Sequence, residues 1–114
     1  MKDNHYEVIF AIVNEGFADD VMNIAREQGA RGGTIINARG VARADAAEFF
    51  GITVHTEKEI VMMVVPKKIK DNILNEIYKE MGMAKKAKGI AFSMPITDTM
   101  GLVDVEEQRN SIQA

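Results

Sequence analysis

The segment that decides the fold of this chain is residues 29–40, with the sequence GARGGTIINARG. Glycines flank a β-branched run, Thr34, Ile35 and Ile36. Glycine reaches backbone angles that other residues avoid, whereas threonine and isoleucine favour a pleated strand. The segment therefore predicts a turn, a strand over residues 33–39, and a second turn into a loop that runs as far as Thr56. If the chain binds a small molecule, we expect the site here.

Outward from this segment, three further strands and two helices are predicted. β-branched and apolar residues dominate three further stretches, which predict strands at residues 6–13, 57–65 and 89–94. Two stretches repeat apolar residues every three or four positions, which predicts amphipathic helices at residues 17–28 and 67–81, ended by Gly29 and Gly82. The order βαββαβ predicts an α+β, ferredoxin-like sandwich, in which a four-stranded antiparallel sheet carries two helices on one face. A polar tail, residues 96–114, follows.

Composition narrows the class of protein. The 114 residues are enough for a single domain, 1–114, and no stretch approaches the ~20 apolar residues that a membrane span needs. Without cysteine the chain forms no disulfides, so nothing argues against a cytoplasmic location, which we expect. The net charge of −3 disfavours a nucleic-acid binder. The two histidines have no metal-binding spacing, and no catalytic constellation is visible, so we expect neither a metal site nor an enzyme.

Two of the predicted strands, residues 6–13 and 57–65, are apolar on both faces. Two helices cover only one face of a four-stranded sheet, and a soluble monomer rarely exposes a large apolar patch. The second face therefore predicts a homo-oligomer. The alternative is that a long loop or the C-terminal tail folds over this face, although the tail is polar.

The motif Gly32-x-Thr34, followed by Arg39-Gly40 and Arg43 before a long loop, resembles the nitrogen-regulatory PII signal-transduction proteins. The lysine-rich linker at residues 83–88 falls where that family has its second ligand loop. The similarity runs from the first strand to about Asp98. It implies a PII-like homotrimer with three clefts between subunits that bind adenine nucleotides, here ATP or ADP. It also implies a T-loop at residues 41–56 that docks on a membrane transporter or a metabolic enzyme.

The chain departs from that family at several positions. Alanines replace two glycines of the linker, Ile90 replaces a lysine, and two arginines after the fourth strand are absent; the residues present are Ala84, Ala87, Ile90, Gly101 and Val103. A glutamine is replaced by Ala44, and residues 41–56 contain no tyrosine for uridylylation. These departures predict altered nucleotide recognition.

Glycine, arginine and lysine side chains make up the predicted ligand site. Glycines let a ligand approach the backbone, arginine forks suit phosphate or carboxylate, and lysines attract anions. The set implied by the resemblance is Gly32, Gly33, Thr34, Arg39, Gly40, Arg43, Lys85, Lys86, Lys88 and Gly89. Each type also has an ordinary interpretation: a helix stop and a tight strand start for the glycines, surface ion pairs with Glu57 or Asp45 for the arginines, and solvated lysines beyond a helix end.

Phe49 and Phe50 in the loop predict a protein-binding anchor, unless one of them folds back over the sheet. Two other function classes stay open. One is a small α+β barrel enzyme, usually dimeric, with His55 or Glu57 as a base. The other is a CutA-like metal-response trimer, against which the absence of cysteine and of clustered histidines argues.

Overall fold

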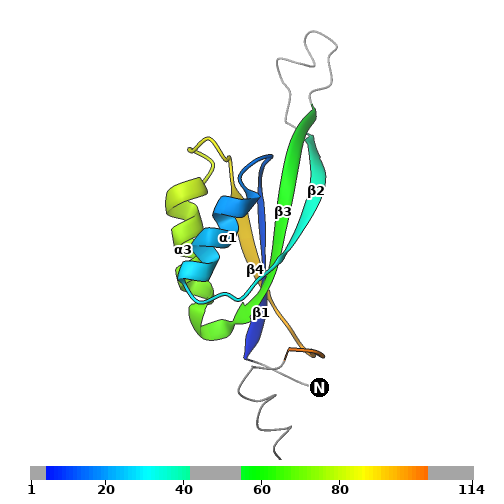
Figure 1. Ribbon diagram of the computed structural model, residues 1–114, viewed down its shortest axis with the longest axis vertical. Coiled ribbons are helices and arrows are strands. Elements are labelled where there is room, and N and C mark those ends of the chain that lie inside the picture. Colours follow the sequence, from blue (N-terminus) through cyan, green and yellow to red (C-terminus); the bar gives the residue numbers. More distant parts are fainter. Residues whose placement is uncertain (1–4, 42–54, 103–114) are drawn as a thin grey trace, which may run out of the picture.

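The computed structural model describes residues 5–41 and 55–102, and Figure 1 shows how their strands and helices are arranged. The elements follow one another as β1 (Tyr6–Asn14), α1 (Ala18–Glu27), β2 (Thr34–Val41), β3 (His55–Pro66), α3 (Lys67–Met81) and β4 (Ile90–Pro95). This is the predicted βαββαβ order. The strands form one antiparallel sheet in the order β2-β3-β1-β4, with both helices on one of its faces (Figure 1). The α+β, ferredoxin-like fold is therefore confirmed.

The bounds of α3 are as predicted, and those of the other elements differ from the predicted ones by one or two residues. β2 begins at Thr34 instead of Gly33 and reaches Val41, because it pairs with β3 as far as Val41 opposite His55. β4 is shifted by one residue, to Ile90–Pro95, because its first pair with β1 is Ile90 opposite Ile12. α1 is one residue shorter at each end than predicted.

The core lies between the helices and one face of the sheet. Alternate residues of β1 and β3 point into it, and the helices add their apolar stripes; the largest completely buried side chains are Ile9, Met63, Ile73, Ile77, Val13, Val21, Val61 and Val65. Burying each side chain of this size contributes roughly 1.5–3 kcal/mol. The period-two pattern of the strands and the helical spacing of the stripes therefore account for the two-layer packing.

Three local features fix the orientation of the helices. Gly29 has a φ of +107°, which confirms the left-handed stop predicted for the first helix. Gly82 also ends its helix, but with an extended backbone, φ −63° and ψ 178°. At the start of α1, the carboxylate of Glu59 in β3 accepts hydrogen bonds from the N–H of Gly16 (2.7 Å) and of Ala18 (3.3 Å). A side chain of the sheet thus caps a helix whose own N-cap residue, Phe17, offers no side-chain hydrogen bond.

The helix layer leaves β2 uncovered on its own side of the sheet. Ile35 is 41% exposed and Val41 is 73% exposed, although both lie on the face that carries the helices. Figure 1 shows β2 and the first part of β3 rising beyond the helices as a two-stranded ribbon. The far half of this ribbon is held mainly by its own pairing.

Candidate functional site

The side of the sheet opposite the helices is an apolar surface, which we call the open face. The cross-strand register brings together Val8 with Val64 and Met94, Phe10 with Met62 and Phe92, and Ile12 with Ile60 and Ile90. The rings of Phe10 and Phe92 stack with their centroids 5.4 Å apart. Phe92 is 42% exposed and Ile90 is 51% exposed, so the part of the chain that the structure describes leaves this surface uncovered. Residues 103–114 of the tail, which are the alternative cover, lie outside the described ranges.

A cavity of about 380 Å³ lies where the decisive glycine segment enters β2, and we call it the glycine pocket. The segment forms one wall, and apolar side chains from the strands form much of the rest. The lining residues are Gly29, Arg31, Gly32, Gly33, Thr34, Tyr6, Met62, Val64, Pro66, Gly101 and Leu102. Three predicted ligand residues, Gly32, Gly33 and Thr34, therefore line one cavity.

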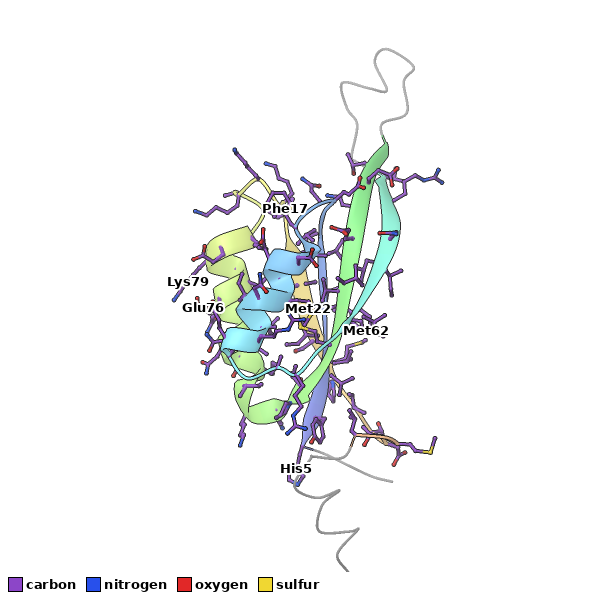
Figure 2. All side chains as sticks on the ribbon, in the orientation of Figure 1. His5, Phe17, Met22, Met62, Glu76 and Lys79 are labelled. Atoms are coloured by element: carbon purple, nitrogen blue, oxygen red, sulfur yellow. The ribbon has the colours of Figure 1, made fainter. Side chains whose placement is uncertain are left out.

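Gly32 and Gly33 have different roles in this pocket. A Cβ on Gly33 would lie 2.9 Å from Met22 Sδ and from the Met62 carbonyl oxygen, so this glycine is needed for packing. Figure 2 shows Met22 on α1 and Met62 on β3 at the level where β2 begins. A Cβ on Gly32 would meet nothing within 4 Å. Gly32 therefore presents open backbone, which a ligand can approach.

The lysine-rich linker between α3 and β4 is held in place by hydrogen bonds to its backbone. Asn14 N–H donates to the Ala87 carbonyl (2.8 Å), and Asn14 Nδ2 donates to the Lys86 carbonyl (2.9 Å). Gly89 N–H donates to the Met81 carbonyl (2.7 Å), and a Cβ on Gly89 would overlap that carbonyl. The close packing at this position therefore requires a glycine. The exposed side chains of Lys85, Lys86 and Lys88 stand on a backbone that is held in place.

Lys58 of β3 belongs with this linker, although the sequence did not point to it. Its ammonium donates to Asn14 Oδ1 at 2.6 Å, and Asn14 in turn holds the Lys86 carbonyl. Gly40 packs against Lys58, because a Cβ there would lie 3.1 Å from Lys58 Cγ and Cε. The sequence did contain one relevant signal. Alternate residues of a strand lie on the same face, so Lys58 shares a face with Ile60 and Met62. We call Lys58, Lys85, Lys86 and Lys88 the lysine cluster.

Lys88 has a φ of +50°, in the left-handed region that a residue with a Cβ occupies at a cost. Its buried neighbours Ala87 and Gly89 are both fixed by the hydrogen bonds described above. Strain of this kind is characteristic of functional loops.

Relief of this strain gives the first prediction. Lys88→Gly is expected to raise the free energy of unfolding by about 0.5–1 kcal/mol, since relief of the left-handed strain exceeds the extra entropy of glycine in the unfolded chain. Lys88→Ala, which keeps a Cβ, serves as the control and should change stability by less than about 0.5 kcal/mol. Urea unfolding measures both. A glycine variant that is no more stable than the alanine variant would show that Lys88 is unstrained.

Arg39 lies on the opposite face from Gly40, because neighbouring strand residues alternate. The register places Arg39 directly opposite Glu57, on the same face of the ribbon. Arg39 is therefore placed suitably for the alternative role considered from the sequence, an ion pair with Glu57.

The predicted ligand residues form two groups in one chain. Thr34 and Gly40 are six residues apart on β2, which separates them by about 20 Å at the usual rise of a strand. Figure 1 shows the segment before β2 at one end of the sheet and the linker between α3 and β4 at the other. The glycine pocket and the lysine cluster are therefore separate parts of the predicted ligand site, and we call these two parts the half-sites. Arg43, Phe49 and Phe50 lie outside the described residues, as do Ala44 and Val103.

A larger cavity, about 580 Å³, lies on the outer surface between α1 and α3. Carboxylates dominate its charged lining, which includes Asp20, Glu27, Glu76 and Glu80 beside Lys85 and Lys86. Negative charge repels an anionic ligand, so its size does not make it the better candidate.

Other features of the described residues lie apart from the half-sites. The pKa of Lys70 on α3 is raised, mainly by its hydrogen bond to Asp71, whose Oδ1 lies 2.8 Å from the ammonium; Lys70 lines neither half-site. Residues 5–41 and 55–102 contain no group of three or more His, Cys, Asp or Glu residues arranged to hold a metal. Within the same ranges, no helix is both long and apolar enough to cross a membrane.

Comparison with solved structures shows the same fold in several proteins. Arabidopsis thaliana PII bound to citrate has a TM-score of 0.62 at 22% identity, over 88% of this chain and 82% of that chain. CPII, a nitrogen regulatory PII-like protein from Thiomonas intermedia K12 bound to ADP, AMP and bicarbonate, gives 0.63 at 12% identity, over 85% and 96%. The B. subtilis GlnK–ATP complex gives 0.67 at 13% identity, over 90% and 91%.

Sequence comparison assigns the family. No curated protein matches the sequence. The family model described as nitrogen regulatory protein P-II matches residues 6–104, which is most of the chain. This match confirms the resemblance. The chain is therefore assigned to neither the barrel enzymes nor the CutA-like proteins. The chain belongs to the nitrogen regulatory protein P-II family.

Proposed function

We propose that this chain is a regulatory protein without enzymatic activity, which binds a small anionic effector between copies of itself. ATP or ADP is the leading candidate for the effector. The signal passes through residues 41–56, with Phe49 and Phe50 as contacts, to a membrane transporter or a metabolic enzyme, in a cytoplasmic pathway linked to nitrogen metabolism. The observation that carries the proposal is the separation of the glycine pocket from the lysine cluster in a chain that also exposes an apolar sheet face.

A homotrimer explains both parts of that observation. Copies that pack their open faces together bury the uncovered apolar side chains, each worth roughly 1.5–3 kcal/mol when fully removed from water. The same packing can place the glycine pocket of one copy beside the lysine cluster of the next. Each cleft then combines backbone donors and an apolar wall from one chain with cations from another. A single chain offers only half of this site.

The proposed effector is an anion because each half-site contains at least one cation. Lys85, Lys86 and Lys88 stand on a fixed backbone at one, and Arg31 lines the other. The ligands of the three similar structures are also anions: citrate, ATP, and ADP, AMP and bicarbonate. At this level of identity, the ligand-binding residues of those proteins are not assigned to positions of this chain. The proposal therefore rests on the charges of this chain, and the ligands of the similar structures serve as the compounds to test.

The hydrogen bonds of Asn14 offer a physical route for the signal. Asn14 links the Lys86 carbonyl of the linker to the ammonium of Lys58 on β3, and Glu15 N–H donates to the Glu57 carbonyl (3.1 Å). An effector that draws Lys58 or Lys86 toward its own charge competes with these bonds. Ligand binding would then favour one of two arrangements at the start of β3, by an amount set by its differential affinity for them.

Thermal unfolding in the presence of ligands tests the proposal. We expect a saturable rise in the unfolding temperature with ATP or ADP, each measured with and without Mg²⁺ beside AMP, cyclic AMP and 2-oxoglutarate. A ligand that binds only the folded protein adds about 2.7 kcal/mol at 100 times its dissociation constant. If no nucleotide shifts the transition at any concentration, the effector is not an adenine nucleotide, and that part of the proposal fails.

Substitutions in the predicted site give a second prediction. Arg39→Ala and Lys88→Ala are each expected to weaken effector binding about tenfold, because a hydrogen bond to a charged group is worth about 1.5–3 kcal/mol. The mass of the assembly should not change. Lys79→Ala is the matched control, since Lys79 lies on the outer surface of α3 beside Glu76 (3.4 Å; Figure 2). Parent-like affinity in both site variants would place the effector elsewhere.

A further inference from the structure

The glycine pocket has one charged group among its described lining residues, the guanidinium of Arg31. Gly32, Gly33 and Thr34 were predicted to contact a ligand from the sequence, whereas Arg31 was not. The structure places all four on the same wall. A guanidinium is charged at every physiological pH and presents a planar fork of donors that matches phosphate and carboxylate.

Backbone donors stand beside this cation. Outside the strand ladders, no backbone hydrogen bond within residues 5–41 and 55–102 uses the N–H of Gly32 or of Gly33. The hydroxyl of Thr34, which is exposed, adds a further donor next to them. Successive N–H groups next to a cation are typical of anion-binding concavities. A Cβ on Gly32 would meet nothing within 4 Å, so the space beside this residue is open, whereas Gly33 is closely packed.

The remaining walls of the pocket are apolar. Met62 and Val64 come from β3, and Leu102 and the ring of Tyr6 complete them. A volume of about 380 Å³ is near the lower end of the range for small-molecule sites. The pocket therefore suits a small organic anion with an apolar ring or chain at one end and its charge at the other.

A second wall of the pocket lacks the side chain that the family resemblance leads one to expect. Position 101, where an arginine was expected, is Gly101, with a φ of +93° and open space around a Cβ built there. Among the described residues, the cation that lines this pocket therefore comes from the segment before β2, and residues 96–102 add none.

We propose that Arg31 binds the anionic group of the effector in the glycine pocket and thereby makes the site select an organic anion over its uncharged counterpart. This inference rests on the proposed function in one respect, the adenine nucleotide used as a probe. It adds to that function a specificity-determining residue and the end of the site at which the charge lies. The lysine cluster of a neighbouring copy is then free to bind a second charge of a larger effector.

The test compares AMP with adenosine, which differ only in the phosphate. The parent protein is expected to bind AMP at least about tenfold more tightly than adenosine, by titration calorimetry. In Arg31→Ala this ratio should fall to near one while the affinity for adenosine is kept, and Arg31→Lys should restore part of it. Arg26→Ala is the matched control, since Arg26 is an exposed arginine at the end of α1, within 3.5 Å of Asn23, and does not line the pocket.

Two results would overturn the assignment of Arg31. If Arg31→Ala keeps the preference for AMP and Lys86→Ala loses it, the phosphate binds at the lysine cluster, and the proposed function stands without this inference. If the parent binds neither AMP nor adenosine, the nucleotide part of the proposed function fails, and citrate and inorganic phosphate decide the question. Binding of either anion that Arg31→Ala abolishes would support the inference. Absence of binding, or binding that does not depend on Arg31, would refute it.

Discussion

Phe10→Asp is expected to convert the proposed homotrimer into single chains. Phe10 lies in the middle of the open face, between Met62 on β3 and Phe92 on β4, and stacks with the ring of Phe92. A carboxylate at this place would be taken out of water without a partner in every copy. Burial of an unpaired charge costs several kcal/mol, which exceeds what an apolar contact at one residue returns.

Light scattering coupled to size-exclusion chromatography measures this change. The parent should elute with about three times the chain mass of 12.6 kDa, and the variant with one. Tyr78→Asp is the matched control, because Tyr78 is 77% exposed on α3, on the other side of the molecule, and should leave the mass unchanged. Circular dichroism establishes that the variant is folded, and Met94→Lys at the edge of the same face provides a milder second variant. A folded Phe10→Asp protein with the parent mass would rule out the open face as the interface.

The largest loss of stability is expected from Gly89→Ala. The added methyl group would overlap the Met81 carbonyl and lie 3.3 Å from Val13 Cγ1, and the hydrogen bond from Gly89 N–H to that carbonyl would have to lengthen. Overpacking typically costs 1–3 kcal/mol, and disturbance of a buried hydrogen bond adds about 1 kcal/mol. We therefore expect the free energy of unfolding to fall by about 3 kcal/mol.

Urea unfolding of Gly89→Ala beside Gly32→Ala provides a matched comparison. Gly32 also precedes a strand, but a methyl group there meets nothing within 4 Å and its φ is not positive, so its stability should change by less than about 0.5 kcal/mol. Both glycines belong to the predicted ligand site, so the comparison separates packing from ligand contact. Equal stability of the two variants would show that the linker adjusts freely and that Gly89 is not needed for packing.

The fold could be predicted because each of its elements has a local signal. The apolar alternation of the strands, the apolar stripes of the helices and the stop at Gly29 can each be recognised in a short stretch of sequence. The bounds of the elements in the structure agree with the predicted bounds to within one or two residues. The open face followed from a count of layers, since two helices cover one side of four strands. Its apolar character is confirmed by the register of Phe10 and Phe92.

The arrangement of the site could not be predicted in the same way. Gly32 and Gly40 are close in sequence and were grouped, yet a strand carries them to opposite ends of the sheet. Lys58 and Asn14 were missed because their hydrogen bond joins residues far apart in the chain. Gly89 was assigned to the ligand on the resemblance, whereas its close contact with Met81 is visible only in three dimensions. Contact of Gly32, Gly40 and Gly89 with a ligand stays a prediction.

The ribbon of β2 and β3 that extends beyond the helices has a consequence for hydrogen exchange. Pairs near its base include the buried Val61, opposite Ile35, whereas Val41 at its tip is 73% exposed. Opening of the tip therefore requires no loss of buried apolar contacts, and its free energy should be a small fraction of that for global unfolding. Amide protection is expected to decrease stepwise from base to tip, so this end of the sheet can rearrange repeatedly while the rest of the protein stays folded.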